Sequence, residues 1–123
     1  MAVRIFVVDD TDHVRKMLVS LLEVSGFDVV GQAASAEQAL SVVASADPQV
    51  VVIDYRMPGM DGIAAARALR EQRPDQAIIL YTAYLDDELR REATEAGVSL
   101  CVGKIEGLTS LERDIRRLAG ELI

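Results

Sequence analysis

The sequence predicts an α/β domain built on a parallel sheet. Two hydrophobic patterns alternate five times along the 123 residues: short apolar runs typical of buried strands, and segments with apolar residues at helical spacing. Strands that alternate with helices lie parallel, because each helix returns the chain to the same end of the sheet. The runs at Val3–Val8, Val50–Ile53 and Ala77–Tyr81 are apolar almost throughout, as expected when helices cover both faces of the sheet.

One predicted strand differs from the others. The five runs are Val3–Val8, Asp28–Gly31, Val50–Ile53, Ala77–Tyr81 and Ser99–Val102. The run at Asp28–Gly31 is short and more polar than the rest, so we expect it at an edge of the sheet.

Each segment between strands carries an apolar stripe. The stripes are Val14, Met17, Leu18 and Leu21; Ala36, Ala39, Leu40 and Val43; Ile63, Ala66 and Leu69; Leu85, Leu89, Ala93 and Ala96; and Leu108, Leu111, Ile115, Leu118 and Leu122. The first four segments end at Gly26, Asp47-Pro48, Arg73-Pro74 and Gly97, which are residues typical of helix termini. The last stripe has the spacing of a coiled coil, but two heptads are few, so we expect it to pack on the core of the domain.

Composition limits the possible functions. The length fits a single domain over residues 1–123, and the net charge of −7 argues against binding of nucleic acid or of an anionic membrane by this chain. No apolar stretch approaches the roughly 20 residues that span a bilayer. The run after Arg4 is too short for a secretory leader and ends in acids. A single cysteine, Cys101, excludes an internal disulfide and fits a cytoplasmic location.

Polar residues gather where the predicted strands end. The first strand is followed by Asp9 and Asp10, the third by Asp54, the fourth by Thr82, and the fifth runs into Lys104. Carboxyl ends of parallel strands share one rim of the sheet, where ligands of such folds bind. Three carboxylates and one lysine leave a charge of about −2, which suits a divalent cation with hard oxygen ligands such as Mg²⁺. The alternative is that Asp9 and Asp10 form a solvated acidic turn.

Asp54 has the position of a reactive group. A carboxylate directly after a buried strand needs a partner, and beside Mg²⁺ it can attack phosphorus to form an acyl phosphate. Asp61 is better explained as the cap of the next helix. Lys104 is one of only two lysines against eleven arginines, and a compact ammonium suits a phosphate as a point charge. His13 follows the acidic pair and is interpreted as a residue of the helix surface.

These residues resemble the receiver domain of two-component response regulators over essentially the whole chain. The resemblance rests on Asp9-Asp10, on "DYRMPGMDG" around Asp54, on Thr82-Ala83 and on Lys104, at spacings that fit the family. It implies that Asp54 is the phosphoacceptor, that Asp10 binds Mg²⁺ directly and Asp9 through water, and that the Arg56 carbonyl completes the protein ligands. It implies that Thr82 is the switch hydroxyl and Lys104 the lysine that binds phosphate.

The resemblance also implies a fold, partners and an output surface. The fold is a doubly wound, flavodoxin-like sheet of five parallel strands in the order 2-1-3-4-5 with helices on both faces. The donor is the phosphohistidine of a sensor histidine kinase or of a histidine phosphotransfer protein, and the chain is a phosphoacceptor that turns over no external substrate. The face of the fourth helix, fifth strand and fifth helix would contact a second copy or an output partner. Its charged residues are Arg90, Arg91, Glu92, Glu95, Glu112, Arg113, Asp114, Arg116 and Arg117.

Two positions depart from the family pattern. Cys101 stands where an aromatic residue usually reports the movement of the threonine, and Tyr84 is a candidate substitute. Ile105 stands where the family has proline after the lysine, often with a cis peptide. A cis bond before a residue other than proline costs about 2.5–4 kcal/mol, so the loop is either trans or strained.

Three other functions fit the sequence less well. A phosphatase with an aspartyl nucleophile would have a second aspartate two residues after Asp54, where this chain has Arg56. A flavin-binding module would need a phosphate loop after the first strand, and "DDTDH" would repel that phosphate. A scaffold that works without phosphorylation would be expected to have lost an acid or the lysine, and all are present.

Overall fold

The computed structural model describes residues 2–120 and contains one five-stranded parallel sheet in the order β2-β1-β3-β4-β5. The strands are β1 (Arg4–Val8), β2 (Asp28–Ala33), β3 (Val50–Ile53), β4 (Ala77–Thr82) and β5 (Leu100–Gly103). The helices are α1 (Asp12–Val24), α2 (Ala36–Ala46), α3 (Gly62–Gln72), α4 (Asp87–Glu95) and α5 (Leu108–Leu118), with a 3₁₀ turn, η1 (Lys104–Glu106), before α5. The predicted fold class and the edge position of the second strand are confirmed, although β2 extends to Ala33.

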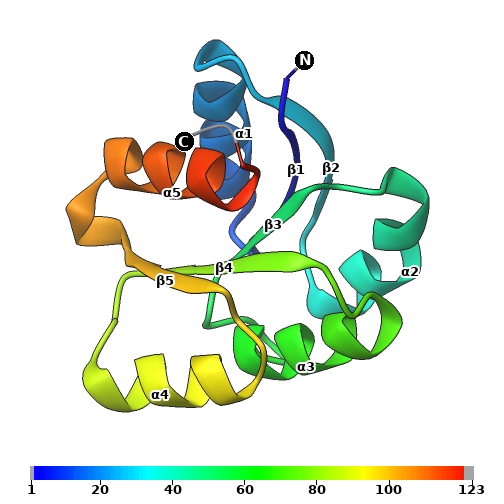
Figure 1. Cartoon of the computed structure of the whole chain (residues 1–123), viewed down its shortest axis with the longest axis vertical. Helices are drawn as coiled ribbons and strands as arrows, with labels where there is room; N and C mark the ends of the chain where they lie inside the picture. Colours follow the sequence, from blue (N-terminus) through cyan, green and yellow to red (C-terminus); the bar gives the residue numbers. More distant parts are fainter. Residues whose placement is uncertain (1, 121–123) are drawn as a thin grey trace.

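Helices cover both faces of the sheet (Figure 1). One face packs against α1 and α5, and the other packs against α2, α3 and α4. Alternate residues of each inner strand enter the two cores; in β1, Ile5 and Val7 face α1 and α5, while Phe6 and Val8 face the other layer. The uninterrupted apolar character of these strands therefore reflects burial on both sides.

The residues predicted to stop helices do so. α2 ends before Asp47, which has a left-handed backbone with φ of 48°, and α4 is followed by Gly97 with φ of 98°. Asp61 caps α3, because its side chain accepts a hydrogen bond from the amide of Ala64 at 2.9 Å. The stops after α2 and α4 return the chain to the starts of β3 and β5 within a few residues.

The apolar stripe predicted for α1 is correct only in part: Leu18 is buried, but Met17 and Leu21 are not. The residues buried against the sheet are Arg15, Leu18, Val19 and Leu22. Met17 is 59% exposed and Leu21 is 41% exposed, and both line an open apolar hollow with Leu108. α1 is apolar over a wide arc, so hydrophobic spacing alone could not decide which part of that arc faces the sheet.

The packing of α5 was predicted correctly where the structure describes it, and Leu122 lies outside the described residues. Leu111 and Ile115 are fully buried. Two charged residues assigned to the output surface face α1 instead. Glu112 accepts a hydrogen bond from the Ser25 hydroxyl, and Arg116 donates to the Ser25 carbonyl at 3.0 Å.

Candidate functional site

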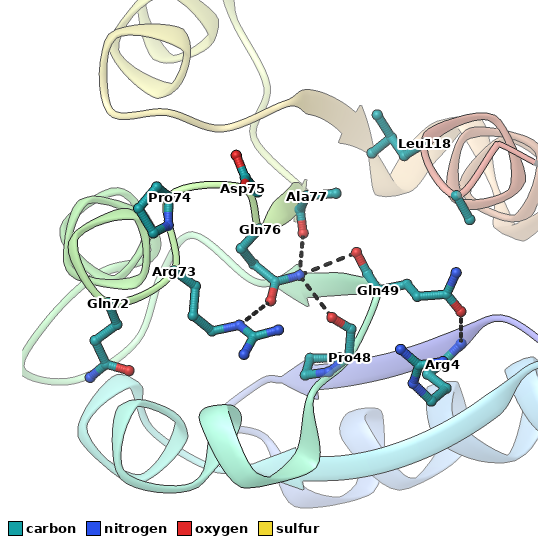
Figure 2. Close-up of a pocket in the computed structure, with 11 residues that line it drawn as sticks. Arg4, Pro48, Gln49, Gln72, Arg73, Pro74, Asp75, Gln76, Ala77 and Leu118 are labelled. Carbon is teal, nitrogen blue, oxygen red and sulfur yellow. Dashed lines mark hydrogen bonds between the residues drawn. The ribbon is translucent and has the colours of Figure 1, made fainter.

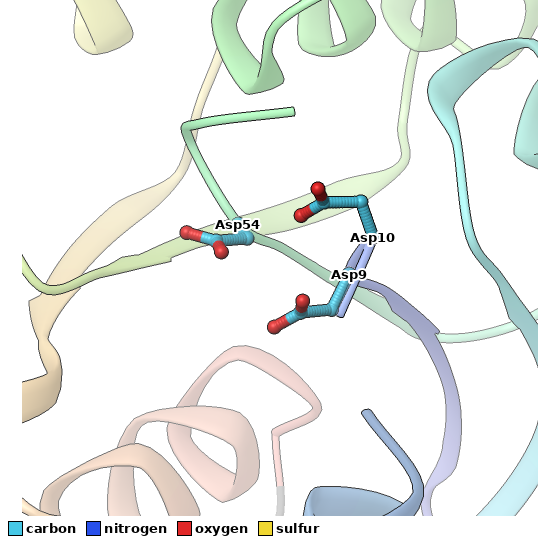
Figure 3. Close-up of side chains that lie close together, drawn as sticks. All are labelled: Asp9, Asp10 and Asp54. Carbon is cyan, nitrogen blue, oxygen red and sulfur yellow. The ribbon is translucent and has the colours of Figure 1, made fainter. Parts of the chain in front are cut away.

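Three carboxylates meet at the carboxyl ends of β1 and β3. Val8 pairs with Ile53 in the sheet, and the Asp54 amide donates to the Val8 carbonyl at 3.0 Å, so the residues after the two strands are neighbours. One carboxylate oxygen from each of Asp9, Asp10 and Asp54 lies within 4.8 Å of the others (Figure 3). The structure thus brings together the three acids that the sequence placed on one rim.

Asp9 is buried and held on several sides. Its Oδ1 accepts a hydrogen bond from the Thr11 amide at 2.9 Å, and its own amide donates to the Ala33 carbonyl at 3.1 Å. Its Oδ2 lies 3.6 Å from the Lys104 ammonium. The first acid is therefore a fixed part of the scaffold.

Asp54 is also largely enclosed, with 17% of its side chain exposed. Its Oδ1 accepts from the Tyr55 amide at 2.8 Å, and its Oδ2 lies 3.4 Å from the Lys104 Nζ. Burial raises the pKa of Asp54, Lys104 opposes that rise, and the negative charge of Asp9 adds to it. The protein therefore does not fully offset the cost of burying the negative charge of Asp54.

Lys104 supplies one positive charge to this acidic rim. It begins η1 directly after β5, and its ammonium lies between Asp9 and Asp54. It also lies 5.7 Å from the centre of the Tyr81 ring. One ammonium against three carboxylates leaves about −2, and hard oxygen donors of this kind fit Mg²⁺. Asp10 opens onto a polar hollow that Arg56 also lines, which leaves space beside the acids.

Thr82 ends β4, and the two unusual positions, Cys101 and Ile105, lie in β5 and in η1. Thr82 is buried, and its hydroxyl accepts a hydrogen bond from the Tyr84 amide at 3.3 Å. Tyr84 is 65% exposed, with the Arg56 guanidinium 4.7 Å from its ring centre. Cys101 is half-buried against the α3 and α4 layer, where burial raises the pKa of its thiol. The Ile105 side chain is 95% exposed, and every peptide bond in the described chain is trans.

Arg15 is a site residue that the sequence analysis missed. It is 8% exposed, and its guanidinium donates to the Asp9 carbonyl at 2.8 Å. Arg15 lies three, four and seven residues before Leu18, Val19 and Leu22, which places a charge on the buried face of α1, and this spacing becomes a signal only once that face is known.

A second hollow lies at the opposite end of the sheet, between α3, the start of β4 and the end of α5 (Figure 2). Gln76 is its central polar residue. The Gln76 amide donates to the carbonyls of Pro48, Gln49 and Ala77, and its oxygen accepts from Arg73 at 2.7 Å. These hydrogen bonds join the ends of the neighbouring strands and loops, so Gln76 and Arg73 have a structural role in this hollow.

The fold and the acidic rim together define a class of protein. A family model described as the response regulator receiver domain matches residues 5–116, and the chain belongs to that family. Response regulator GacA of Pseudomonas viridiflava is 35% identical over 115 residues, which cover 93% of this chain and 54% of that protein. The DNA-binding transcriptional activator DevR/DosR of Mycobacterium tuberculosis is 41% identical over 108 residues, covering 86% and 50%.

Solved structures agree with this assignment. A crystal structure of a LuxR-family two-component response regulator from Aurantimonas sp. SI85-9A1 superposes with a TM-score of 0.93 at 31% identity, over 98% of this chain and 87% of that one. The chain spans about half the length of the two curated relatives. Among residues 2–120, no helix is long and apolar enough to cross a bilayer.

Proposed function

We propose that this chain is a single receiver unit that accepts a phosphoryl group on Asp54 from a phosphohistidine of a sensor kinase or phosphotransfer protein. The observation that carries the proposal is the grouping of Asp54 with Asp9, Asp10 and the Lys104 ammonium at one rim. A phosphoacceptor needs a fixed carboxylate with positive charge beside it, and the structure provides both.

Asp54 is the nucleophile of the proposed transfer. A carboxylate oxygen forms a new bond to phosphorus while the P–N bond of the phosphohistidine breaks, and the departing imidazole keeps the bonding electrons and takes up a proton. The hydrogen bond from the Tyr55 amide to Oδ1 holds the carboxylate in one orientation. Positioning and charge neutralisation supply most of the catalysis in reactions of this kind.

The acidic residues form the proposed Mg²⁺ site. Asp10 would bind the ion directly, Asp9 through water, and Asp54 and the Arg56 carbonyl would complete the protein ligands. Bound Mg²⁺ would neutralise charge on the phosphoryl oxygens. Lys104, which pairs with Asp54 and Asp9 here, would turn to a phosphoryl oxygen after transfer, and the Thr82 hydroxyl would donate to another.

Phosphorylation would then change the surface formed by α4, β5 and α5. The acyl phosphate adds about one negative charge and three acceptor oxygens, which draw the loops after β4 and β5 toward Asp54. A second copy or an output partner would recognise the altered surface; DevR/DosR is a DNA-binding activator, so a DNA-binding output is one such partner. The chain would act on no external substrate, and its single cysteine and its family support a cytoplasmic location.

The proposal is tested by intact-mass spectrometry with a small phosphodonor such as phosphoramidate. We expect a mass increase of one phosphoryl group that requires Mg²⁺ and is absent from Asp54→Asn. If wild-type protein binds Mg²⁺ but gains no phosphoryl group, the scaffold function takes the place of this proposal.

A further inference from the structure

We infer that Arg15 is a positioning residue of the acidic site: its buried guanidinium fixes the backbone from which Asp9 and Asp10 project, and the affinity for Mg²⁺ depends on it. This inference rests on the proposed function, because it concerns the same cation site. It adds a residue that contributes no ligand atom.

Arg15 joins three elements through three donors. Its Nη1 donates to the Asp9 carbonyl after β1 at 2.8 Å, and its Nη2 donates to the Asp12 carboxylate in the first turn of α1 at 2.7 Å. Its Nε donates to the Gln32 side chain on β2 at 2.9 Å. A planar guanidinium holds its donors in a fixed fork, so these three contacts define one geometry.

The contact with the Asp9 carbonyl has a direct consequence for the site. That carbonyl belongs to the peptide that joins Asp9 to Asp10, so holding it fixes the plane between the two acids. The other peptide of Asp9 is held as well, since its amide donates to Ala33 on β2. β2 thus holds both sides of Asp9, directly through Ala33 and through the Arg15–Gln32 contact.

The location of Arg15 is costly for a merely structural residue. It occupies the buried face of α1 with Leu18 and Val19, where an apolar side chain would continue the pattern. Burying a charge costs stability through desolvation, and only good geometry with complete hydrogen bonding repays that cost. Its ion pair with Asp12, whose side chain is 71% exposed, offers limited compensation. The acceptor that explains the location is the carbonyl between the two acids.

Positioning and simple electrostatics predict opposite results for Arg15→Met. Removing a positive charge near a cation site would by itself strengthen Mg²⁺ binding. Loss of positioning would weaken it, and loss of a residue that orients metal ligands typically costs about 10–100-fold in affinity. Arg15→Lys keeps the charge but loses the fork, so positioning predicts weaker binding for this variant too.

The test is calorimetric titration of the full chain with Mg²⁺, on variants shown to be folded by circular dichroism. A matched control is Arg70→Lys, since Arg70 also donates to backbone carbonyls, at Gly97 and Pro74, away from the acids. We expect Mg²⁺ dissociation constants about 10–100-fold higher for Arg15→Met and Arg15→Lys and unchanged for Arg70→Lys. If Arg15 were merely structural, its variants would unfold at a lower midpoint, as Arg70→Lys would, and the folded proteins would bind Mg²⁺ with unchanged affinity.

Several outcomes would overturn the inference. Unchanged or tighter binding by Arg15→Met and Arg15→Lys removes the positioning role while leaving the proposed function intact. Absence of Mg²⁺ binding by wild-type protein removes both. If neither Arg15 variant folds, Gln32→Ala decides, because Gln32 is exposed and holds the guanidinium from β2. We expect weaker Mg²⁺ binding by Gln32→Ala, and unchanged binding would contradict the inference.

Discussion

Replacing Gly62 by alanine should disturb the site through the backbone that carries Asp54. Gly62 begins α3, and its amide donates to the Tyr55 carbonyl at 2.8 Å. A Cβ at this position would lie 3.0 Å from the Tyr55 Cα and 2.9 Å from Leu80 Cδ1, and closer still to the Asp54 carbonyl oxygen. Ordinary contact begins at 3.4 Å, so the segment after β3 must move by several tenths of an ångström.

Two opposing effects set the size of the change. Overpacking of a buried position typically costs about 1–3 kcal/mol. Alanine in place of glycine in a helix returns up to about 1 kcal/mol. Because the closest groups are backbone atoms, we expect the first effect to win, with a net loss of about 1–2 kcal/mol in the free energy of unfolding. A displacement approaching 1 Å costs about a hundredfold in rate, so we expect phosphorylation of Asp54 to slow by roughly ten- to a hundredfold.

Urea unfolding and the rate of phosphorylation by phosphoramidate measure the two effects. Gly103→Ala is the matched control, because Gly103 also borders the site but a Cβ there would meet only ordinary contacts at 3.8–3.9 Å. Gly103→Ala should change stability and rate little. A Gly62→Ala protein with wild-type stability and rate would refute the reasoning.

Three further predictions concern the charges and the aromatic residue of the site. Burial raises the pKa of Asp54, so the wild-type protein loses stability as the pH rises from about 3.8 through the raised value. Without Mg²⁺, Asp54→Asn should therefore gain stability relative to wild type over that pH range. A difference in urea midpoints that does not change with pH would contradict this. Lys104→Met should bind Mg²⁺ more tightly by calorimetry, since a competing cation is lost, yet unfold about 1 kcal/mol more easily in its absence. Tyr84→Ala loses a stack with Arg56 worth about 0.5–1 kcal/mol. If Tyr84 takes the place of the usual aromatic residue, this variant should show smaller phosphorylation-dependent NMR shift changes in α4 and β5. Unchanged shift changes would exclude Tyr84 from that role.

The sheet and its acidic rim could be predicted because each depends on local signals. Val50–Ile53 is apolar without interruption, and such a strand needs cover on both faces whatever the rest of the chain does. Asp54 follows it directly, and parallel topology then brings Asp54 to Asp9. Neither step required knowledge of side-chain packing.

The face that α1 turns to the sheet could not be predicted in the same way. Its apolar residues cover so wide an arc that two overlapping stripes fit helical spacing, and only tertiary packing selects between them. The correct stripe includes Arg15, which a hydrophobic pattern excludes. Of the three acceptors of Arg15, the Asp9 carbonyl and the Gln32 side chain on β2 are not visible as a sequence motif.

The orientation of α5 shows the same difficulty on a smaller scale. Glu112 and Arg116 carry charges that suit an exposed output surface. Both instead contact Ser25 at the end of α1, a partner 87 and 91 residues away in sequence. Long-range polar contacts of this kind follow from the packing of the two helices, which apolar spacing did not determine.

Mapping the phosphorylated residue is the most direct test of the central claim. Borohydride reduces an aspartyl phosphate to homoserine, which peptide mass spectrometry locates in the sequence. After incubation with phosphoramidate and Mg²⁺, we expect homoserine at position 54 and at no other acid of the rim. Modification of Asp9 or Asp10, or a stable phosphoryl group on His13, would contradict the assignment of Asp54 as the phosphoacceptor.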